Sequence, residues 1–158
     1  MVWRSMAGAA RQRDGASRRA AMQSRVEAGV PIGILGYSGG VPIAWCSIAP
    51  RDTYRHLGGL DDGGAPEQVW ALACFFVKRE HRGHGISKKL LQAAIDHAAR
   101  NGATVVEAYP VDPDSPSYRF MGFVDTFSGA GFRKVGEAGQ RRHVMRIPIL
   151  PLHQASRS

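Results

Sequence analysis

The sequence is poor in cysteine and contains no long hydrophobic run. Its 158 residues include two cysteines, Cys46 and Cys74, and both lie among apolar neighbours. Thiols in such surroundings favour buried, reduced side chains, so we expect a cytoplasmic protein. No segment stays apolar over the roughly 20 residues that a transmembrane helix needs, and the charges near the amino end lack the apolar core of a secretory signal. The sequence therefore predicts no membrane partner.

Metal-ligand spacings and internal repeats are also absent. The six histidines do not recur at the short spacings that zinc sites use, so no metal is expected. A chain of 158 residues can bury one core and is short for two. We therefore expect one domain over residues 26–150, after a basic, flexible segment at 1–25 and before a flexible tail at 151–158.

Acidic residues are scarce relative to basic ones, and the net charge is +8. Much of the excess lies in residues 1–25, which contain six arginines and one aspartate. Such an arm can bind nucleic acid, but a solvated tail is the commoner outcome for so few charges. Nucleic-acid binding is therefore not expected, and an arginine-armed nucleic-acid binder remains an alternative that rests on charge alone.

What the chain does contain is a strand, a glycine turn and a helix in succession. Val69–Val77 is a short apolar run typical of a buried strand. Residues 82–87 follow, and their two glycines, Gly83 and Gly85, leave no Cβ in the way of a ligand. Residues 86–100 carry apolar side chains at helical spacing. Backbone N–H groups can then converge on a phosphate at the positive end of the helix, and we expect a pyrophosphate there.

The alternative for this motif is an ordinary strand-to-helix turn, because a Gly-x-Gly alone is weak evidence. Five basic residues surround the turn and favour a polyanionic ligand, although a solvated charged face has the same composition. These residues are Lys78, Arg79, Arg82, Lys88 and Lys89.

The remaining segments fit the same single α/β domain. Residues 17–28 predict a helix, and the pair Gly39-Gly40 between two apolar runs predicts a β-hairpin. A short helix and loop are expected over 51–62, and a flexible link over 61–66. A closing strand pair is expected over 132–149.

In order and spacing, these pieces resemble the GNAT superfamily of acyl-CoA-dependent N-acyltransferases, over roughly residues 30–149. The resemblance implies an α/β (α+β) fold with a central mixed, mostly antiparallel sheet flanked by helices. The family normally begins with a strand, whereas the opening of this chain is rich in alanine and arginine. The residues that carry the resemblance are Val77, Arg82-Gly83-His84-Gly85-Ile86, Leu90, Leu91, the strand at 104–109 and Ala130-Gly131-Phe132.

The resemblance also implies acetyl-CoA as the acyl donor. Backbone groups of Phe75, Phe76 and Val77 would contact the pantetheine arm and the acetyl carbonyl. The backbone amides from Arg82 to Ser87 would hold the pyrophosphate, and Ser87 stands where the family usually has glycine or alanine. The residues expected to hold the pyrophosphate are Arg82, Gly83, His84, Gly85, Ile86 and Ser87.

Amine acetylation needs a base, and an acid for the departing thiolate. Glu107 matches the position where many family members carry a glutamate base; the alternative is a strand carboxylate paired with an arginine or open to solvent. Phe127 stands where the family often has a tyrosine acid, and a phenyl ring donates no proton. Either the thiolate leaves unaided, or Tyr109, Tyr118 or Ser128 replaces the acid.

The segment after Glu107 is a candidate lining of the acceptor pocket. The proline-rich stretch after Glu107 favours an extended loop whose side chains line an acceptor pocket, and a loop without contact to the substrate is the alternative. The residues named for this lining are Tyr109, Asp112, Asp114 and Tyr118.

Cys74 lies near the expected thioester, so an acyl-cysteine intermediate is a further alternative. No activating histidine stands near Cys74 in the sequence, which weighs against it.

Together these observations predict an N-acetyltransferase that moves an acetyl group from acetyl-CoA to a primary amine by direct attack in a ternary complex. The acceptor is a small molecule or a peptide amine, and a homodimer is left open. A non-catalytic acyl-CoA-binding module is the alternative, in which the missing tyrosine at Phe127 marks lost chemistry.

Overall fold

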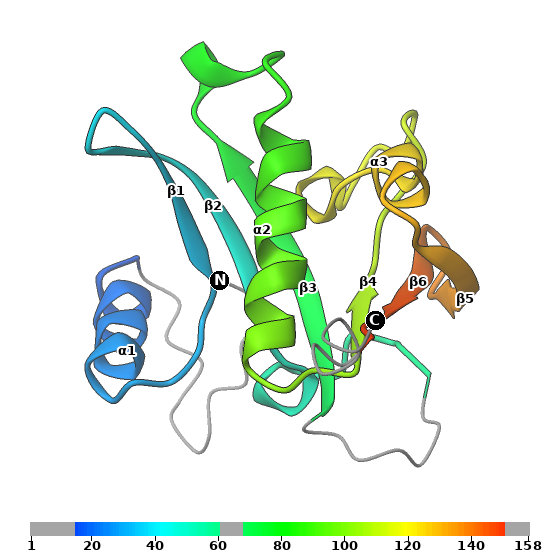
Figure 1. Cartoon of the computed structure of the whole chain (residues 1–158), viewed down its shortest axis with the longest axis horizontal. Coiled ribbons are helices and arrows are strands. Elements are labelled where there is room, and N and C mark those ends of the chain that lie inside the picture. Colours follow the sequence, from blue (N-terminus) through cyan, green and yellow to red (C-terminus); the bar gives the residue numbers. More distant parts are fainter. Residues whose placement is uncertain (1–14, 61–67, 151–158) are drawn as a thin grey trace, which may run out of the picture.

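The computed structural model describes residues 15–60 and 68–150, which form a six-stranded sheet with helices against it (Figure 1). The strand order is β1-β2-β3-β4-β6-β5, and only β3 and β4 run parallel. The predicted fold class, a mixed and mostly antiparallel sheet flanked by helices, is confirmed. The strands are β1 Ile34–Ser38, β2 Val41–Pro50, β3 Val69–Val77, β4 Val105–Ala108, β5 Arg133–Ala138 and β6 Arg142–Pro148. The helices are α1 Gly15–Glu27, α2 Ile86–Arg100 and α3 Val124–Gly129, and short 3₁₀ turns are η1 Arg51–Thr53, η3 Arg79–His81 and η4 Arg119–Met121.

The predicted hairpins are both present. Gly39 and Gly40 join β1 to β2 with φ of 54° and 76°, a left-handed backbone that glycine adopts without steric cost. β5 and β6 form the predicted closing pair, and Gly139 between them has a φ of 70°. The short helix expected within 51–62 extends over η1 alone, and the link predicted at 61–66 lies outside the described residues.

The helix predicted over residues 17–28 is α1. None of its side chains is buried, and Val26 on its apolar side is exposed. The predicted domain boundary at residue 25 falls inside this helix. Residues 1–14 of the predicted basic segment and the predicted tail at 151–158 lie outside the described residues.

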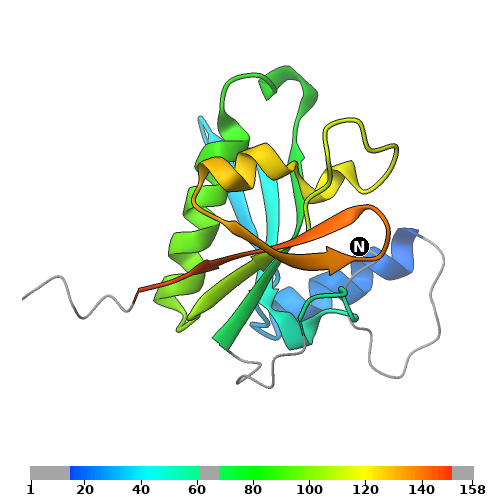
Figure 2. The same cartoon turned by 90° about the vertical axis from the view of Figure 1, so that its right-hand side faces the viewer.

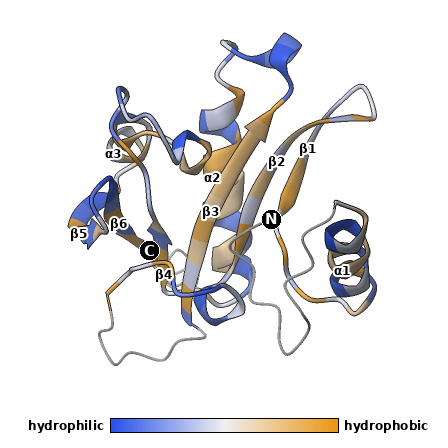
Figure 3. Cartoon of the chain, turned by 180° about the vertical axis from the view of Figure 1, so that it is seen from behind, coloured by the Kyte–Doolittle hydropathy of each residue, from blue (hydrophilic) through white to orange (hydrophobic). Residues whose placement is uncertain are grey.

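Apolar side chains fill both faces of the sheet. α2 covers one face, where its apolar stripe packs against β2 and β3 (Figure 1). The opposite face carries a second cluster, which includes Tyr54, Leu57 and Met121 from segments outside the strands, and Figure 2 shows the segment after η1 on that side. β3 lies between the two clusters and is apolar along nearly its whole length (Figure 3). The buried residues of the α2 stripe are Leu90, Leu91, Ala94, Ile95 and Ala98.

A β-bulge in β3 changes which side chains face α2. Ser47 of β2 pairs with Cys74, but the next residue, Ile48, pairs with Leu72, so Ala73 has no partner in β2. A bulge of this kind shifts the alternation of the strand by one residue. Phe75 therefore packs on the same core as Leu72, although strict alternation would place them on opposite faces.

β3 and β4 pair over only four residues and then separate. Val69 to Leu72 pair with Val105 to Ala108, after which β3 continues to Val77 while the chain leaving β4 turns toward α3 (Figure 1). The far half of β3 is thus paired with β2 on one edge, and no described strand pairs with its other edge. Backbone groups on that edge are placed to bind an extended ligand.

Candidate active site

The glycine turn between η3 and α2 forms an open cradle. Gly83 and Gly85 have φ of 80° and 73°, and a Cβ added to either would contact nothing within 4 Å. Gly85 is the N-cap of α2, and no side chain caps this end of the helix. The N–H groups at the start of α2 therefore face open space at the positive end of a 15-residue helix, as the sequence predicts for an anion site.

Arg82 belongs to the framework of this cradle. Its Nε donates a hydrogen bond to the carbonyl oxygen of Val77 at 2.9 Å, which ties the turn to the end of β3. Its backbone N–H donates to the carbonyl oxygen of Arg79 at 3.2 Å. Because this amide already has an acceptor, the open part of the cradle begins at Gly83 and runs through His84 and Ser87, which are exposed.

The three residues predicted to line the acyl-donor arm lie on the half of β3 that β4 leaves. Phe75 is half-buried and packs edge to face against Phe127, with ring centroids 5.8 Å apart. Phe76 is 52% exposed and Val77 is buried. Phe127 is fully buried and also contacts Phe132, so the residue at the family's tyrosine position is a core residue here.

Glu107 lies at the centre of a buried ionic cluster. Its side chain is 0% exposed, and Arg146 Nε donates to its Oε2 at 2.6 Å. Arg51 Nη1 lies 3.3 Å from Oε1 and 3.4 Å from Oε2, and the Tyr109 hydroxyl makes a short hydrogen bond to Oε1. The sequence left two structural alternatives for Glu107, pairing with an arginine or exposure to solvent. The structure shows Glu107 paired with two arginines and buried from solvent.

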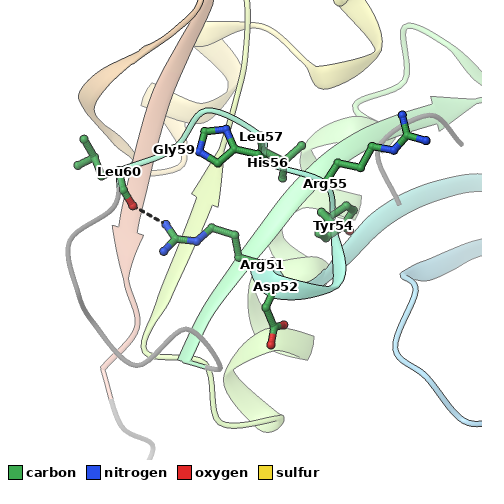
Figure 4. Close-up of a pocket in the computed structure, with 8 residues that line it drawn as sticks. All are labelled: Arg51, Asp52, Tyr54, Arg55, His56, Leu57, Gly59 and Leu60. Carbon is green, nitrogen blue, oxygen red and sulfur yellow. Dashed lines mark hydrogen bonds between the residues drawn. The ribbon is translucent and has the colours of Figure 1, made fainter. Parts of the chain in front are cut away.

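The segment after η1 covers this cluster. Arg51 Nη1 donates to the carbonyl oxygen of Leu60 at 2.9 Å, as Figure 4 shows. Gly59 lies so close to Glu107 that a Cβ at this position would overlap the carboxylate. Glycine is required here because any side chain would displace the carboxylate or the segment.

A pocket adjoins the cluster. Its volume is about 330 Å³, and the segment from Arg51 to Leu60 lines it (Figure 4). It meets Glu107 through Arg51 and Gly59, which contact the carboxylate and line the pocket. The size is in the range of small-ligand sites, about 300–1,000 Å³.

Tyr109 is hydrogen-bonded to Glu107. Its side chain is fully buried, and burial, followed by the neighbouring Glu107 charge and hydrogen bond, raises its pKa well above the ordinary tyrosine value. Its hydroxyl carries one proton, and that proton is directed at Glu107. Tyr109 therefore has no second proton to offer a leaving thiolate while this bond is intact.

Tyr118 lies in a neighbouring part of the same face. It has a left-handed backbone with a φ of 59°, the only such non-glycine residue among those described. Its ring lies under the guanidinium of Arg142, 5.1 Å from the ring centroid, and it lines a second pocket of about 250 Å³. Asp112 and Asp114, predicted near the acceptor, and Ser128, named as a possible acid, are exposed. Asp112 accepts a hydrogen bond from His143 Nε2 at 3.0 Å when that nitrogen carries a proton.

Cys74 does not have the surroundings of a reactive thiol. It is half-buried, and burial raises its pKa. A raised pKa keeps the thiol protonated and weakly nucleophilic at neutral pH. Burial also raises the pKa of Cys46. The acyl-cysteine alternative therefore gains no support.

The sequence analysis missed Arg51, Gly59 and Arg146. Arg146 reaches Glu107 because β6 pairs with β4 in a register that places the two residues opposite each other. Arg51 is the first residue of η1, directly after β2, and lies more than 50 residues before Glu107 in the chain. No local spacing connects these positions, and only the strand order brings them together.

Comparison with known proteins identifies the family. A sequence profile of the acetyltransferase (GNAT) family matches residues 3–123. The chain belongs to this family. It is thus an acyltransferase with the GNAT fold, as predicted. A search of curated proteins finds no match.

Solved structures share the fold of this GNAT chain. The Salmonella typhimurium protein yncA, a putative acetyltransferase solved with its cofactor acetyl-CoA, superposes with a TM-score of 0.59 at 22% identity, covering 94% of this chain and 80% of the other. A ribosomal-protein-alanine N-acetyltransferase from Brucella melitensis gives 0.59 at 19% identity, with 86% and 79% covered. The paia N-acetyltransferase from Thermoplasma acidophilum, in complex with coenzyme A, gives 0.59 at 14% identity, with 85% and 72% covered.

Over residues 15–60 and 68–150, no helix has both the length and the apolar character needed to cross a membrane. Within the same ranges, no group of three or more histidine, cysteine or acidic side chains is arranged to hold a metal ion.

Proposed function

We propose that this protein transfers the acetyl group of acetyl-CoA to a primary amine in a ternary complex. The observation that carries the proposal is the separation of β3 from β4 beside the open cradle at the start of α2. The separation exposes an unpaired strand edge for an extended arm, and the cradle offers backbone N–H groups to a diphosphate. Bound acetyl-CoA and coenzyme A in the yncA and paia structures support this choice of donor.

The transfer forms one bond and breaks another. The amine nitrogen attacks the thioester carbonyl, the C–S bond breaks as the tetrahedral intermediate collapses, and the amine gives up a proton to a base. N–H groups on the free edge of β3 beyond Leu72 would stabilise the oxyanion. Coenzyme A leaves as a thiolate that then takes a proton.

We propose Glu107 as the base, because Arg51 and Gly59, which lie against its buried carboxylate, also line the 330 Å³ pocket that we propose for the acceptor. Tyr118 remains the proposed acid, since the Tyr109 proton is used by Glu107. A thiol has a pKa of about 8–9, so the thiolate can also leave unaided. Tyr118→Phe separates these two cases, since only an acid role predicts a fall in kcat.

The first test is binding and turnover. Calorimetric titration with acetyl-CoA should show binding, and free thiol should appear when amines from a broad panel are added. Gly85→Ala, which places a methyl group in the cradle, should weaken binding. Failure to bind acetyl-CoA at millimolar concentration would overturn the proposal.

The second test concerns Glu107, whose loss would also disturb the ionic cluster. Glu107→Gln removes the carboxylate. Arg146→Gln disturbs the same cluster but leaves the Glu107 carboxylate in place. A base role predicts that Glu107→Gln lowers kcat by about 10²–10⁴-fold, far more than Arg146→Gln, with acetyl-CoA affinity nearly unchanged in both. Equal losses in the two variants would assign Glu107 a structural role instead.

A non-catalytic acyl-CoA-binding module is the second candidate. It is favoured by the engagement of Glu107 with two arginines and by the buried Phe127. Binding of acetyl-CoA without thiol release for any amine would select it.

A further inference from the structure

Tyr118 has a backbone conformation that is unfavourable for a residue with a side chain. Its φ is 59°, and among the described residues it alone, glycines aside, has a positive φ. In this region the Cβ approaches the following carbonyl oxygen, so the conformation persists only where neighbouring contacts hold it. Such strain clusters at functional sites. The contacts that hold Tyr118 therefore bear on its proposed role as the acid.

Residues 112–122 form a closed loop, the Tyr118 loop. At its base, the N–H of Val111 donates to the carbonyl oxygen of Gly122 at 3.0 Å, and the N–H of Val124 donates to that of Val111 at 3.1 Å. The Tyr118 ring packs on the second core cluster, and Figure 2 shows the loop, in yellow-green, on the side of the sheet opposite α2. The loop is a defined unit, so its internal contacts decide how Tyr118 lies.

Arg119 connects the two parts of this loop. Its Nη1 donates to the carbonyl oxygen of Pro113 at 2.6 Å and to that of Ser115 at 3.3 Å. Its guanidinium lies over the Phe123 ring, 4.8 Å from the centroid, which is a favourable cation–π distance. One rigid, planar group thus joins residues before Tyr118 to a residue after it.

Tyr118 is also linked to the pocket proposed for the acceptor. Its ring lies 5.1 Å from the Arg142 guanidinium, and Arg142 Nη1 donates to the carbonyl oxygen of Leu57 at 2.9 Å. Leu57 lines the 330 Å³ pocket. A change in the Tyr118 backbone would therefore move its ring relative to that pocket.

We propose that Arg119 is a positioning residue, which holds the Tyr118 loop so that the Tyr118 hydroxyl is directed at the leaving thiolate. The inference rests on the proposed function, because Tyr118 is the proposed acid of that reaction. As the C–S bond breaks, the hydroxyl proton moves to the sulfur, and the tyrosinate then takes a proton from water. Arg119 is exposed, so its substitution should change stability little. A small displacement of a catalytic group, in contrast, can lower the rate strongly.

The experiment is a double-mutant cycle of Arg119→Gln and Tyr118→Phe, assayed by release of coenzyme A thiol. Arg119→Gln should lower kcat about tenfold, less than the roughly 10²-fold that a 1 Å misplacement can cost, with KM for acetyl-CoA and Tm unchanged. Tyr118→Phe should lower kcat at least as much. In the Tyr118→Phe background, Arg119→Gln should have almost no further effect, because residues that act through one another are not additive.

Arg100→Gln is the matched control. It makes the same change at an exposed arginine of α2 and should leave kcat unchanged in both backgrounds. If Arg119→Gln does not fold, Phe123→Leu, which removes the ring beside the guanidinium, takes its place in the cycle and should show the same coupling to Tyr118→Phe.

Three results would overturn the inference and leave the acetyltransferase proposal intact. The first is wild-type kcat in Arg119→Gln. The second is a pair of losses that multiply in the double variant, because Arg119 would then act independently of Tyr118. The third is an unchanged kcat in Tyr118→Phe, which would remove the acid that Arg119 positions. Failure of the wild type to release thiol with any amine would instead overturn the proposed function, and the inference with it.

Discussion

The cradle and the Glu107 cluster are built in opposite ways. The cradle consists of consecutive residues, uses backbone N–H groups and leaves the space above its glycines open. The cluster joins Arg51 of η1, Glu107 of β4, Tyr109 just after β4 and Arg146 of β6. It uses side chains, and its carboxylate is buried. A site of backbone groups can bind a ligand without losing internal contacts, whereas a satisfied side-chain cluster contributes to the fold itself.

This difference predicts that stability depends on the cluster and donor binding on the cradle. Removing the buried carboxylate gives the largest expected effect. Glu107→Leu should lower the free energy of unfolding by about 3–5 kcal/mol, because two guanidinium groups lose their shared partner. Urea denaturation measures this loss. Glu137→Leu, at a carboxylate that is 65% exposed, is the control and should leave the free energy of unfolding nearly unchanged. Equal losses would contradict the contrast.

Tyr109→Phe tests the same cluster more gently. Removing the hydroxyl leaves Oε1 of Glu107 with one donor fewer, at a cost of about 1–3 kcal/mol at neutral pH. Denaturation midpoints measured from pH 7 upward check this value and the pH dependence below.

The pH dependence follows from the direction of the shift. The pKa of Tyr109 is raised in the folded state, so its contribution is complete below the ordinary tyrosine pKa and is lost as pH rises above it toward the folded value. The wild type should therefore lose more stability than Tyr109→Phe on going to alkaline pH. Parallel curves would contradict the burial of this hydroxyl. Tyr37→Phe, at an exposed side chain, is the control.

Substitution in the cradle should weaken acetyl-CoA binding, which substitution in the cluster should leave nearly unchanged. Gly85→Ala forces a left-handed conformation on a residue with a Cβ, which costs about 1–2 kcal/mol, and it should weaken acetyl-CoA binding about tenfold, equivalent to about 1.4 kcal/mol. Gly139→Ala is closely matched, since its φ is 70° and its surroundings are open. Gly139→Ala should reproduce the loss of stability and leave binding unchanged, as calorimetry can show.

The smallest effect is expected at an exposed ion pair on β5. Lys134 Nζ lies 2.9 Å from Glu137 Oε1, and this hydrogen bond and charge lower the pKa of Glu137. Its small contribution is present above the ordinary carboxyl pKa and is lost as pH falls through the lowered value. In Lys134→Met the pKa of Glu137 should rise toward the ordinary value, which an NMR titration of its side chain can follow. An unchanged titration would show that the pair does not persist in solution.

The elements that could be predicted are those encoded by neighbouring residues. The apolar run of β3, the glycine turn and the helical periodicity of α2 each depend on contacts within a few residues, so the pattern of the chain was sufficient. The same applies to the hairpin at Gly39 and Gly40, where positive φ requires glycine. The short helix and loop expected over 51–62 correspond to η1 and the segment that follows it, described as far as Leu60. The path of this segment depends on its contacts with Arg51 and Glu107, which its own sequence does not encode.

The order of the elements, the resemblance to the GNAT family and the position of the cradle could all be read from the chain, because they follow from short-range periodicity and backbone stereochemistry. The enclosure of Glu107 by Arg51 and Arg146, the hydrogen bond that Tyr109 donates to Glu107, and the pocket of about 330 Å³ beside them become visible in the folded sheet alone. These contacts depend on which strands are neighbours and in which register. Strand order arises from packing of the whole sheet, so no local pattern in the chain encodes it.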